Sequence, residues 1–528
     1  MVYGGKPSTG CYLCRKRKIK CDEGRPECRN CGVYGRPCPG YRPDAVFRNE
    51  NKRVERQAKK DILSSDISSQ SVTPLSQPPG DVDRHSGSPS STNTSLSLIP
   101  IADATWEDRA ICYFFDQYIV KSDNEDGVGH LDYLPLLYSQ IDQQKSTSSC
   151  LRWAVDATAF MTLANVSRAP QLMMKARRGY GKALSSLREA LASPTEALKD
   201  ETFASVVILS LFEDVTGERN GLYSSHTAGF EFLMKIRGKG QLNNRHGRDM
   251  FNFAYTHTSV EILALGDKPR IDMEWILELL NIDDPVDRLM LAASKLSQLF
   301  LAMQAAPSPP DLAIVKQWMT AGQECDFELS QWTLHLPDRW LPLVVYSAQG
   351  ETLLTYNRIS NCVIWNYYRA VRIMLQQLLL SLKRSYSDLI SKNKVPDDPF
   401  PVNVALDETS LRAVIQEMTT DVCRSIPFAM SDVDTLGRPT KPGDYQSTIR
   451  AVQGYALLWP LWYIVSCGMP SPQQAKQINL VLYRIGNQQG INLALILARE
   501  AERIRGDNNS FRAPPLESDL PEFIPHDH

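Results

Sequence analysis

Six cysteines near the start of the chain have the spacing to hold metal ions. Three of them recur after a shift of 17 residues, so the segment is an internal repeat with three thiols in each half. A structural zinc ion takes four tetrahedral ligands. Two ions therefore need eight bonds, and six thiolates supply eight only if one equivalent pair of cysteines bridges both ions. The pattern is C-x2-C-x6-C-x6-C-x2-C-x6-C, formed by Cys11, Cys14, Cys21, Cys28, Cys31 and Cys38.

Three disulfides, an iron–sulfur site or a chance arrangement are the other interpretations of these cysteines. Disulfides need an oxidising compartment, and the chain begins Met-Val-Tyr-Gly-Gly-Lys without the apolar region of a signal peptide. We therefore expect the protein to fold in the cytosol with reduced thiols. Six other cysteines are scattered singly, mostly among apolar residues, as free buried thiols usually are, and we assign them no chemistry. These are Cys112, Cys150, Cys325, Cys362, Cys423 and Cys467.

A run of five cations lies between the second and third cysteines: Arg15, Lys16, Arg17, Lys18 and Lys20. Residues 12–18 contain neither Gly nor Pro, which favours a short helix. A charge run is usually only a solvated face, but here bound metal would fix the backbone around the cations. Lys and Arg are the side chains that bond guanine O6 and N7 in the major groove. The run therefore predicts binding to double-stranded DNA.

The repeat, over about residues 8–43, resembles the fungal binuclear zinc cluster, the Zn2Cys6 DNA-binding domain. The resemblance implies two Zn2+ ions bridged by Cys11 and Cys28. It also implies that the fourth residue after the second cysteine, here Lys18, reads a CGG triplet from the end of the helix. Arg17 stands where the family frequently has lysine, and Pro26 stands in the loop where the family also has a proline. The residues expected to meet phosphates are Arg15, Lys16 and Lys20.

The formal net charge of −2 conceals a basic head and an acidic remainder. Residues 1–60 contain sixteen Lys and Arg against six Asp and Glu, while the rest contains 42 against 54. Such asymmetry is typical of a nucleic-acid-binding protein. The cations between residues 52 and 60 would also serve as a nuclear import signal. We therefore expect the protein in the nucleus.

Residues 46–100 are predicted to be a basic segment followed by a disordered linker. There is no Phe, Trp or Tyr from residue 48 to 105, and residues 64–97 hold twelve serines and four prolines. Such a stretch buries too little apolar surface to offset its chain entropy. Val54, Ala58 and Ile62 share helical spacing, but a coiled coil needs three or four filled heptads. A monomer and a homodimer formed through the C-terminal region both stay open, and a dimer's geometry would set the half-site spacing.

Residues 101–510 are predicted to form a large all-α regulatory domain. Their apolar residues follow a helical period, no strand or hairpin signals recur, and no fixed repeat length is present. The run 206–212 could be a strand in isolation, but its flanks lack turn residues. Between Pro170 and Pro194 one apolar face is formed by Leu172, Ala176, Tyr180, Ala183, Leu184, Leu187 and Leu191. The long helices are expected at 106–120, 151–166, 170–193, 196–213, 284–305, 355–383 and 406–424.

Two stretches of this region, residues 176–213 and 418–428, resemble the fungal-specific transcription-factor domain found behind zinc clusters. The resemblance implies a helical regulatory region that accepts a small-molecule effector or a co-regulator protein, and it carries over no binding residue. Residues 454–469 are strongly apolar, but Pro460 interrupts them and a membrane span needs about 20 such residues. We expect a buried core helix there. Residues 511–528 form an acidic tail, either an activation segment or an inert terminus.

The sequence offers no catalytic constellation, so we expect no enzyme. Gly179-Tyr180-Gly181-Lys182 lacks the first glycine and the final Ser or Thr of a phosphate-binding loop, and no G-x-S-x-G, H-E-x-x-H or dinucleotide fingerprint occurs. The prediction is a zinc-dependent, sequence-specific regulator of RNA polymerase II genes, with residues 1–45 as its DNA-binding domain. The resemblance implies control of a metabolic or secondary-metabolite pathway. The alternative is a co-regulator whose zinc domain contacts protein rather than DNA.

Overall fold

The computed structural model divides the chain into two units, Met1–Ile99 and Pro100–His528, which are described here separately as the head and the body. Pro26, the basic segment, the linker to residue 100 and the acidic tail lie outside the residues that the structure describes. The described residues are 10–24, 27–40, 105–121, 129–143, 149–219, 224–265, 277, 280–307, 309–393, 407–440 and 450–506.

The head contains two short helices, α1 (Tyr12–Lys16) and α2 (Arg29–Val33). Each follows a cysteine of the repeat, Cys11 or Cys28, at its N-cap position. The helix predicted over residues 12–18 is therefore present, but it stops at Lys16. Four of the six cysteines are buried and make up the core of the head, in which no other side chain is fully buried among the described residues. Bound metal must replace the apolar core that a domain of this size cannot build.

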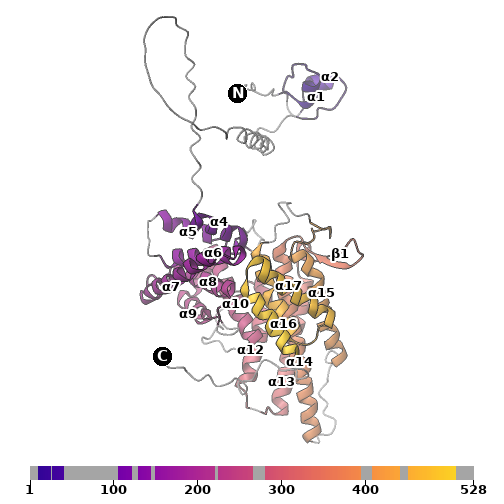
Figure 1. Ribbon diagram of the computed structural model, residues 1–528. Helices are drawn as coiled ribbons and strands as arrows, with labels where there is room; N and C mark the ends of the chain where they lie inside the picture. The colour runs from indigo at the N-terminus through magenta and orange to yellow at the C-terminus, as the bar shows by residue number, and fades with distance from the viewer. Residues whose placement is uncertain are drawn as a thin grey trace, which may run out of the picture. The chain divides into compact units, whose positions relative to one another are not determined.

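The body is helical, as the period of its sequence predicts (Figure 1). Each of the long helices predicted from the sequence is present, and most ends are shifted by a few residues. The exception is the helix predicted at 355–383, which begins at Ile359 and continues to Asn393, while Thr355 belongs to a strand. Its helices are α4 (Trp106–Tyr118), α5 (Leu134–Gln143), α6 (Cys150–Ser167), α7 (Pro170–Ala192), α8 (Asp200–Thr216), α9 (Thr227–Arg237), α10 (Arg245–Leu265), α12 (Pro285–Ala305), α13 (Leu312–Leu334), α14 (Ile359–Asn393), α15 (Glu408–Ala429), α16 (Ala451–Ser466), α17 (Pro472–Gln489) and α18 (Asn492–Gly506).

One contiguous hydrophobic core runs through the body from α4 to α18. In its N-terminal part α6 packs on α4, α7 and α8, and in its C-terminal part α14 packs on α13, α15 and α16. Figure 1 shows both groups as bundles of neighbouring helices. The run 206–212, ambiguous in the sequence, lies within α8 and is buried on all sides. Burial on all sides explains why this helix shows no amphipathic period.

Helix α7 has the amphipathic pattern that the sequence predicts. Leu172, Ala176, Ala183 and Leu187 are buried, whereas Leu184, placed on the same face by the sequence pattern, is exposed. The GYGK sequence lies inside this helix, so it is no phosphate loop. A Cβ at Gly179 would come within 3.2 Å of the Cβ of Ala157, and the glycine therefore permits a close approach of α6 and α7.

A two-stranded antiparallel hairpin, which the sequence analysis did not predict, interrupts the helices. Strand β1 (Leu343–Tyr346) pairs with β2 (Thr352–Thr355), with Leu343 opposite Thr355 and Tyr346 opposite Thr352. Gly350 takes a φ of +81° in the turn, where a side chain is disfavoured. Two short runs of apolar and β-branched residues around a Gly-containing turn were the available signal, but each strand is only four residues long.

The apolar residues 454–469 form most of α16, whose buried side chains include Leu457, Leu461 and Ile464. Pro460 lies inside the helix. The expectation of a buried core helix is confirmed. None of the described helices is long and apolar enough to cross a membrane.

Candidate metal centre and nucleic-acid interface

The six cysteine sulfurs of the head form two groups of four. One group is Cys11, Cys14, Cys21 and Cys28, and the other is Cys11, Cys28, Cys31 and Cys38. Within each group all sulfurs lie within 4.8 Å of one another. The groups share Cys11 and Cys28, which occupy the same position in the two halves of the repeat. Each group offers the four thiols that one tetrahedral zinc ion requires.

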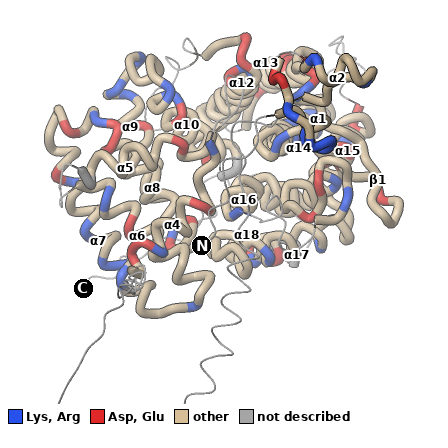
Figure 2. The backbone as a smooth tube through the Cα atoms, turned by 90° about the horizontal axis from the view of Figure 1, so that it is seen from above, with Lys and Arg blue, Asp and Glu red and all other residues tan. Residues whose placement is uncertain are grey.

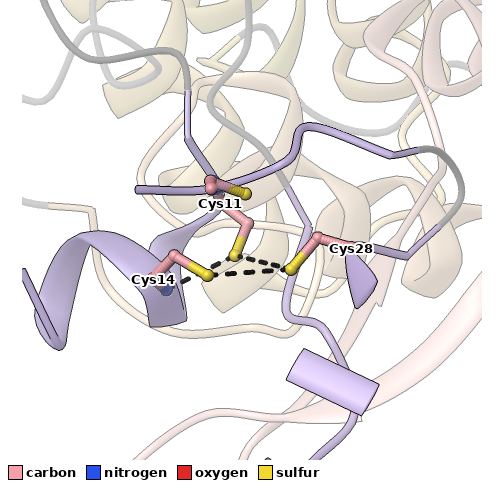
Figure 3. A group of neighbouring side chains, drawn as sticks. Cys11, Cys14 and Cys28 are labelled. Carbon is pink, nitrogen blue, oxygen red and sulfur yellow. Dashed lines mark hydrogen bonds between the residues drawn. The ribbon is translucent and has the colours of Figure 1, made fainter. Parts of the chain in front are cut away.

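The distances between the sulfurs suit zinc. Cys11 Sγ lies 3.6 Å from Cys28 Sγ and 3.6 Å from Cys31 Sγ, and Cys14 Sγ lies 3.7 Å from Cys28 Sγ. Figure 3 shows three of these sulfurs pointing toward one another. Sulfurs about 2.3 Å from a common zinc ion lie about 3.8 Å apart in a tetrahedron. All six cysteines are free rather than disulfide-bonded, so the donor set fits zinc and the disulfide alternative is wrong.

Backbone amides support the sulfurs. The Cys14 amide donates to Cys11 Sγ at 3.4 Å, and the amides of Cys11 and Glu23 donate to Cys21 Sγ at 3.5 and 3.4 Å. The hydrogen bonds that Cys21 accepts, of which the one from the Cys11 amide counts most, lower the pKa of Cys21 to about 7. Burial instead raises the pKa of Cys14 to about 12. Thiolate is the form that binds metal, so zinc must displace protons from the buried thiols and acid must weaken its binding.

The internal repeat of the sequence is also a repeat of the backbone. The caps that end α1 and α2, Arg17 and Tyr34, have φ and ψ of −82° and −2° and of −78° and −3°. The next residues have a positive φ, +55° at Lys18 and +69° at Gly35.

The hydrogen bonds around these turns repeat as well. Lys18 N–H donates to Arg15 O at 3.1 Å, and Gly35 N–H donates to Gly32 O at 3.0 Å. One residue further on, Ile19 N–H donates to Cys14 O at 3.1 Å, and Arg36 N–H donates to Cys31 O at 3.2 Å. Both helices thus end in a Schellman turn, in which the residue after the cap is usually glycine.

Lys18 is therefore a lysine at a glycine position. A left-handed conformation costs a residue with a Cβ about 1 kcal/mol relative to glycine, and Gly35 avoids this cost at the equivalent place. Lys18 is also exposed, at the end of α1. Strain at a single residue points to a role for its side chain, and the backbone alone gives no reason for a lysine here.

The structure separates the five predicted DNA-binding cations into two kinds. Lys16, Lys18 and Lys20 are exposed, whereas Arg15 and Arg17 are partly buried. Figure 2 shows the basic run in blue at α1. The two arginines lie over tyrosine rings, at 5.9 Å from the Tyr12 centroid and 3.5 Å from the Tyr34 centroid.

A group of buried charges in the body escaped the sequence analysis. The guanidinium of Arg219, fully buried, lies 3.0 Å from Asp214 and 2.6 Å from Glu261. His257 Nε2 lies 3.6 Å from the Glu261 carboxylate. Burial acts to raise the pKa of Glu261, but His257, Thr227 and Arg219 outweigh it and leave that pKa below its ordinary value. The cluster connects α8 to α10, and its residues are too far apart in the sequence to form a recognisable motif.

The same cluster extends to two further helices. Tyr455 Oη, on α16, donates to Asp214 Oδ2 at 2.9 Å. Tyr180, on α7, lies 3.3 Å from His226 Nε2, and burial lowers the pKa of His226. The cluster holds four helices together, which explains its buried charges without any catalytic role. The scattered cysteines are free, and of these Cys112 is exposed, against the expectation of burial.

Two family models match the chain. Residues 9–45 match the fungal Zn(2)-Cys(6) binuclear cluster domain, which confirms the resemblance of the cysteine repeat and implies zinc binding. Residues 132–299 match the fungal specific transcription factor domain. The stretch 176–213 lies within this second match, and the stretch 418–428 lies outside it.

Curated relatives match short stretches of the chain. An uncharacterized protein of Emericella nidulans is 32% identical over 126 residues, 23% of this chain and 27% of the relative. The aspercryptin biosynthesis cluster-specific transcription regulator atnN of the same organism is 54% identical over 39 residues, 7% of this chain and 6% of the relative. The transcriptional regulatory protein pro1 of Neurospora crassa is 39% identical over 77 residues, 14% of this chain and 11% of the relative.

The chain thus spans about a quarter or less of the length of these relatives. No solved structure matches the chain. The two family models describe a zinc cluster domain and a transcription factor domain, and the relative pro1 is named a transcriptional regulatory protein. The chain thus carries two segments that are similar to family domains, a fungal Zn(2)-Cys(6) binuclear cluster domain at residues 9–45 and a fungal specific transcription factor domain at residues 132–299.

Proposed function

We propose that the protein is a nuclear, zinc-dependent regulator of RNA polymerase II genes that binds double-stranded DNA at CGG-type half-sites. Residues 1–45 form the DNA-binding domain, residues 46–100 the basic segment and linker, residues 101–510 the regulatory domain and residues 511–528 the acidic tail. The family match over residues 9–45 supports the head of this arrangement, and the match over 132–299 supports a regulatory body.

The head binds two zinc ions, with Cys11 and Cys28 as the bridging ligands. The two groups of four sulfurs share only these two cysteines. The six cysteines therefore supply four ligands to each of two ions, and no further ligand is needed. The zinc supplies no reaction; its part is to fix the two helices relative to each other. The cysteines of each half then hold the turn that follows their helix, and with it the basic side chains.

Lys18 contacts the bases, and the observation that carries this proposal is its backbone conformation. The turn after α2 uses glycine at the equivalent position, with a φ of +69° at Gly35 against +55° at Lys18. A lysine there does not stabilise the fold, because its side chain is exposed at the end of the helix. It is instead free to enter the major groove of DNA. A lysine reaching guanine O6 and N7 in the major groove discriminates between bases by about 1–3 kcal/mol.

The remaining cations of the run supply attraction to the DNA backbone. Lys16 and Lys20 are exposed and meet phosphates together with Arg15 and Arg17. Such contacts position the head without reading sequence. They also make affinity fall steeply with salt, because each neutralised phosphate releases counterions.

The body restrains or relays activation and accepts a small-molecule effector or a co-regulator protein. A relative in Emericella nidulans is named as the regulator of a biosynthesis cluster, and this similarity supports control of a metabolic or secondary-metabolite pathway. The protein acts as a monomer or as a homodimer formed through the body, and the number of CGG triplets in its site will separate these two forms.

The test is a selection from random DNA duplexes with the full zinc-loaded chain, repeated with Lys18→Gly. Glycine relieves the left-handed turn, so the variant should keep its zinc and its fold. We expect the wild type to enrich CGG-containing sites and Lys18→Gly not to, with affinity for such a site lowered roughly 5- to 150-fold.

Lys16→Gln is the matched control, since it removes an exposed cation from the same helix. It should weaken binding to all sequences alike and keep the CGG preference. A Lys18→Gly variant that still selects CGG would contradict the assignment of Lys18. A wild-type protein that holds zinc and enriches no sequence would favour the alternative, a zinc domain that contacts protein.

A further inference from the structure

One contact between the two helical turns of the head joins a cation to an aromatic ring. The guanidinium carbon of Arg17 lies 3.5 Å from the centroid of the Tyr34 ring, well inside the 6 Å over which a cation interacts with an aromatic face. Arg36 also lies near this ring, but at 5.9 Å. Tyr34 is therefore paired mainly with Arg17.

The internal repeat explains why these two residues meet. Arg17 and Tyr34 are 17 residues apart, which is the period of the cysteine repeat, and both are caps at the end of their helices. The two helices that they end are in contact. The stack thus links equivalent positions of the two halves. The cation, Arg17, belongs to the half with the basic run, and the ring, Tyr34, belongs to the half without a basic run.

Stacking leaves the hydrogen-bonding edge of the arginine available. A guanidinium lies against a ring with its flat face, while its five N–H donors point outward in the plane. Within residues 10–24 and 27–40, as the structure describes them, no carboxylate forms an ion pair with Arg17. Tyr34 itself is about half exposed, at 46%, so its ring is not a core residue that the fold requires.

We propose that Tyr34 is a positioning residue for DNA binding, which holds the guanidinium of Arg17 ready to donate to a DNA phosphate. A free arginine loses side-chain entropy when it is ordered. The ring orders Arg17 before DNA arrives, so less of this entropy is lost on binding. This inference rests on the proposed function, since it assumes that the head binds DNA.

The experiment measures affinity of the full zinc-loaded chain for a CGG-containing duplex and for an unrelated duplex between 50 and 200 mM salt, which is roughly the range over which phosphate contacts dominate. Tyr34→Phe keeps the ring, and Tyr34→Leu removes it. We expect Tyr34→Phe to bind within about twofold of the wild type and Tyr34→Leu to bind about three- to fivefold more weakly to both duplexes. The salt slope should not change, because neither substitution alters charge.

Arg17→Ala and the double variant Tyr34→Leu/Arg17→Ala complete a double-mutant cycle. In the Arg17→Ala background the loss caused by Tyr34→Leu should disappear, since the ring then has no cation to hold. Arg17→Lys is a second route that leaves Tyr34 in place. It should also bind about threefold more weakly at an unchanged salt slope, because an ammonium cannot stack flat on the ring.

Three results would overturn the inference alone: equal binding by Tyr34→Leu and the wild type, a loss that persists in the Arg17→Ala background, or a loss as large in Tyr34→Phe. If Tyr34→Leu loses its zinc, Arg17→Lys decides, and its binding at wild-type strength would overturn the inference. A wild type that binds neither duplex at any salt would instead overturn the proposed function, and this inference with it.

Discussion

The two halves of the zinc head share a backbone and differ in their side chains. In each half a cysteine precedes a short helix, and the residue after the helix cap has a positive φ, +55° at Lys18 and +69° at Gly35. The basic run of the first half has no counterpart in the second. Where the first half has Arg15, Lys16, Arg17, Lys18 and Lys20, the second has Gly32, Val33, Tyr34, Gly35 and Pro37.

This difference shows which residues each task constrains. The cysteines and the turn are common to both halves because the metal centre needs them twice. The residues between the cysteines are not needed for the metal, so one half can carry the cations that we propose bind DNA while the other carries a ring and small residues. If this division is right, substitution of a metal ligand should have the same effect in either half. A change of charge between the cysteines should have different effects in the two halves.

The largest expected effect is the loss of a bridging thiol. Cys11→Ser and Cys28→Ser should each abolish zinc binding by both groups of sulfurs and reduce DNA binding to background, because each of these cysteines belongs to both groups. The binding free energy of a structural zinc is folding free energy, about 10–16 kcal/mol for small zinc domains. Zinc content per chain and duplex binding measure the result.

The body supplies the internal control for these variants. It has its own hydrophobic core, so its thermal unfolding transition should not move when the head loses its metal. Retention of one zinc ion by one of the two variants, with complete loss by the other, would show that the two halves are not equivalent.

Much of the head could be predicted from the sequence, because its constraints are local. Spacing alone gave the repeat, the number of ligands and the need for a bridging pair. The left-handed conformation of Lys18 could not be predicted, because lysine disfavours it; only an alignment of the repeat with itself, which places Lys18 on Gly35, contains the signal. The stack of Arg17 on Tyr34 follows from the same alignment only once the two halves are known to be in contact.

For the body, the sequence predicted the positions of the helices but not how the helices pack together. Period and proline positions located α7 well, but nothing in the sequence paired Arg219 with Glu261, since such contacts depend on which helices pack together. The β1–β2 hairpin was missed because its strands are short and β1 is exposed, which leaves little of the alternation that marks a strand. Long-range packing, rather than local preference, decides these features.

The second prediction exchanges charge between equivalent positions of the two halves. Lys16→Val should weaken DNA binding roughly tenfold at low salt and make the salt slope shallower by about one unit, because one phosphate contact is lost. Val33→Lys should leave specific binding within about twofold, although Val33 is 90% exposed and a lysine there adds the same charge to the head. Salt titrations of both variants on one CGG-containing duplex measure the difference. Equal and opposite effects would show that both halves face the DNA.

The smallest effect concerns the two turns, and it tests whether they are equivalent. Gly35→Ala should destabilise the head by about 1 kcal/mol, because alanine disfavours the left-handed conformation. A Cβ at Gly35 would meet no atom within 4 Å, so the cost comes from the backbone alone. Lys18→Gly should stabilise the head by a similar amount for the same reason. Competition with a zinc chelator measures both, as shifts of about fivefold in opposite directions.

Gly32→Ala is the control for this pair. A Cβ at Gly32 also meets no atom within 4 Å, but Gly32 lies within α2, where alanine is the better helix former. It should therefore hold zinc at least as well as the wild type. If Lys18→Gly also weakened zinc binding, the lysine would be contributing to the fold, and the argument that its side chain serves DNA would lose its physical basis. If Gly35→Ala weakened zinc binding and Lys18→Gly did not, the two turns would share a backbone requirement and differ only in the role of the side chain, as the comparison of the halves requires.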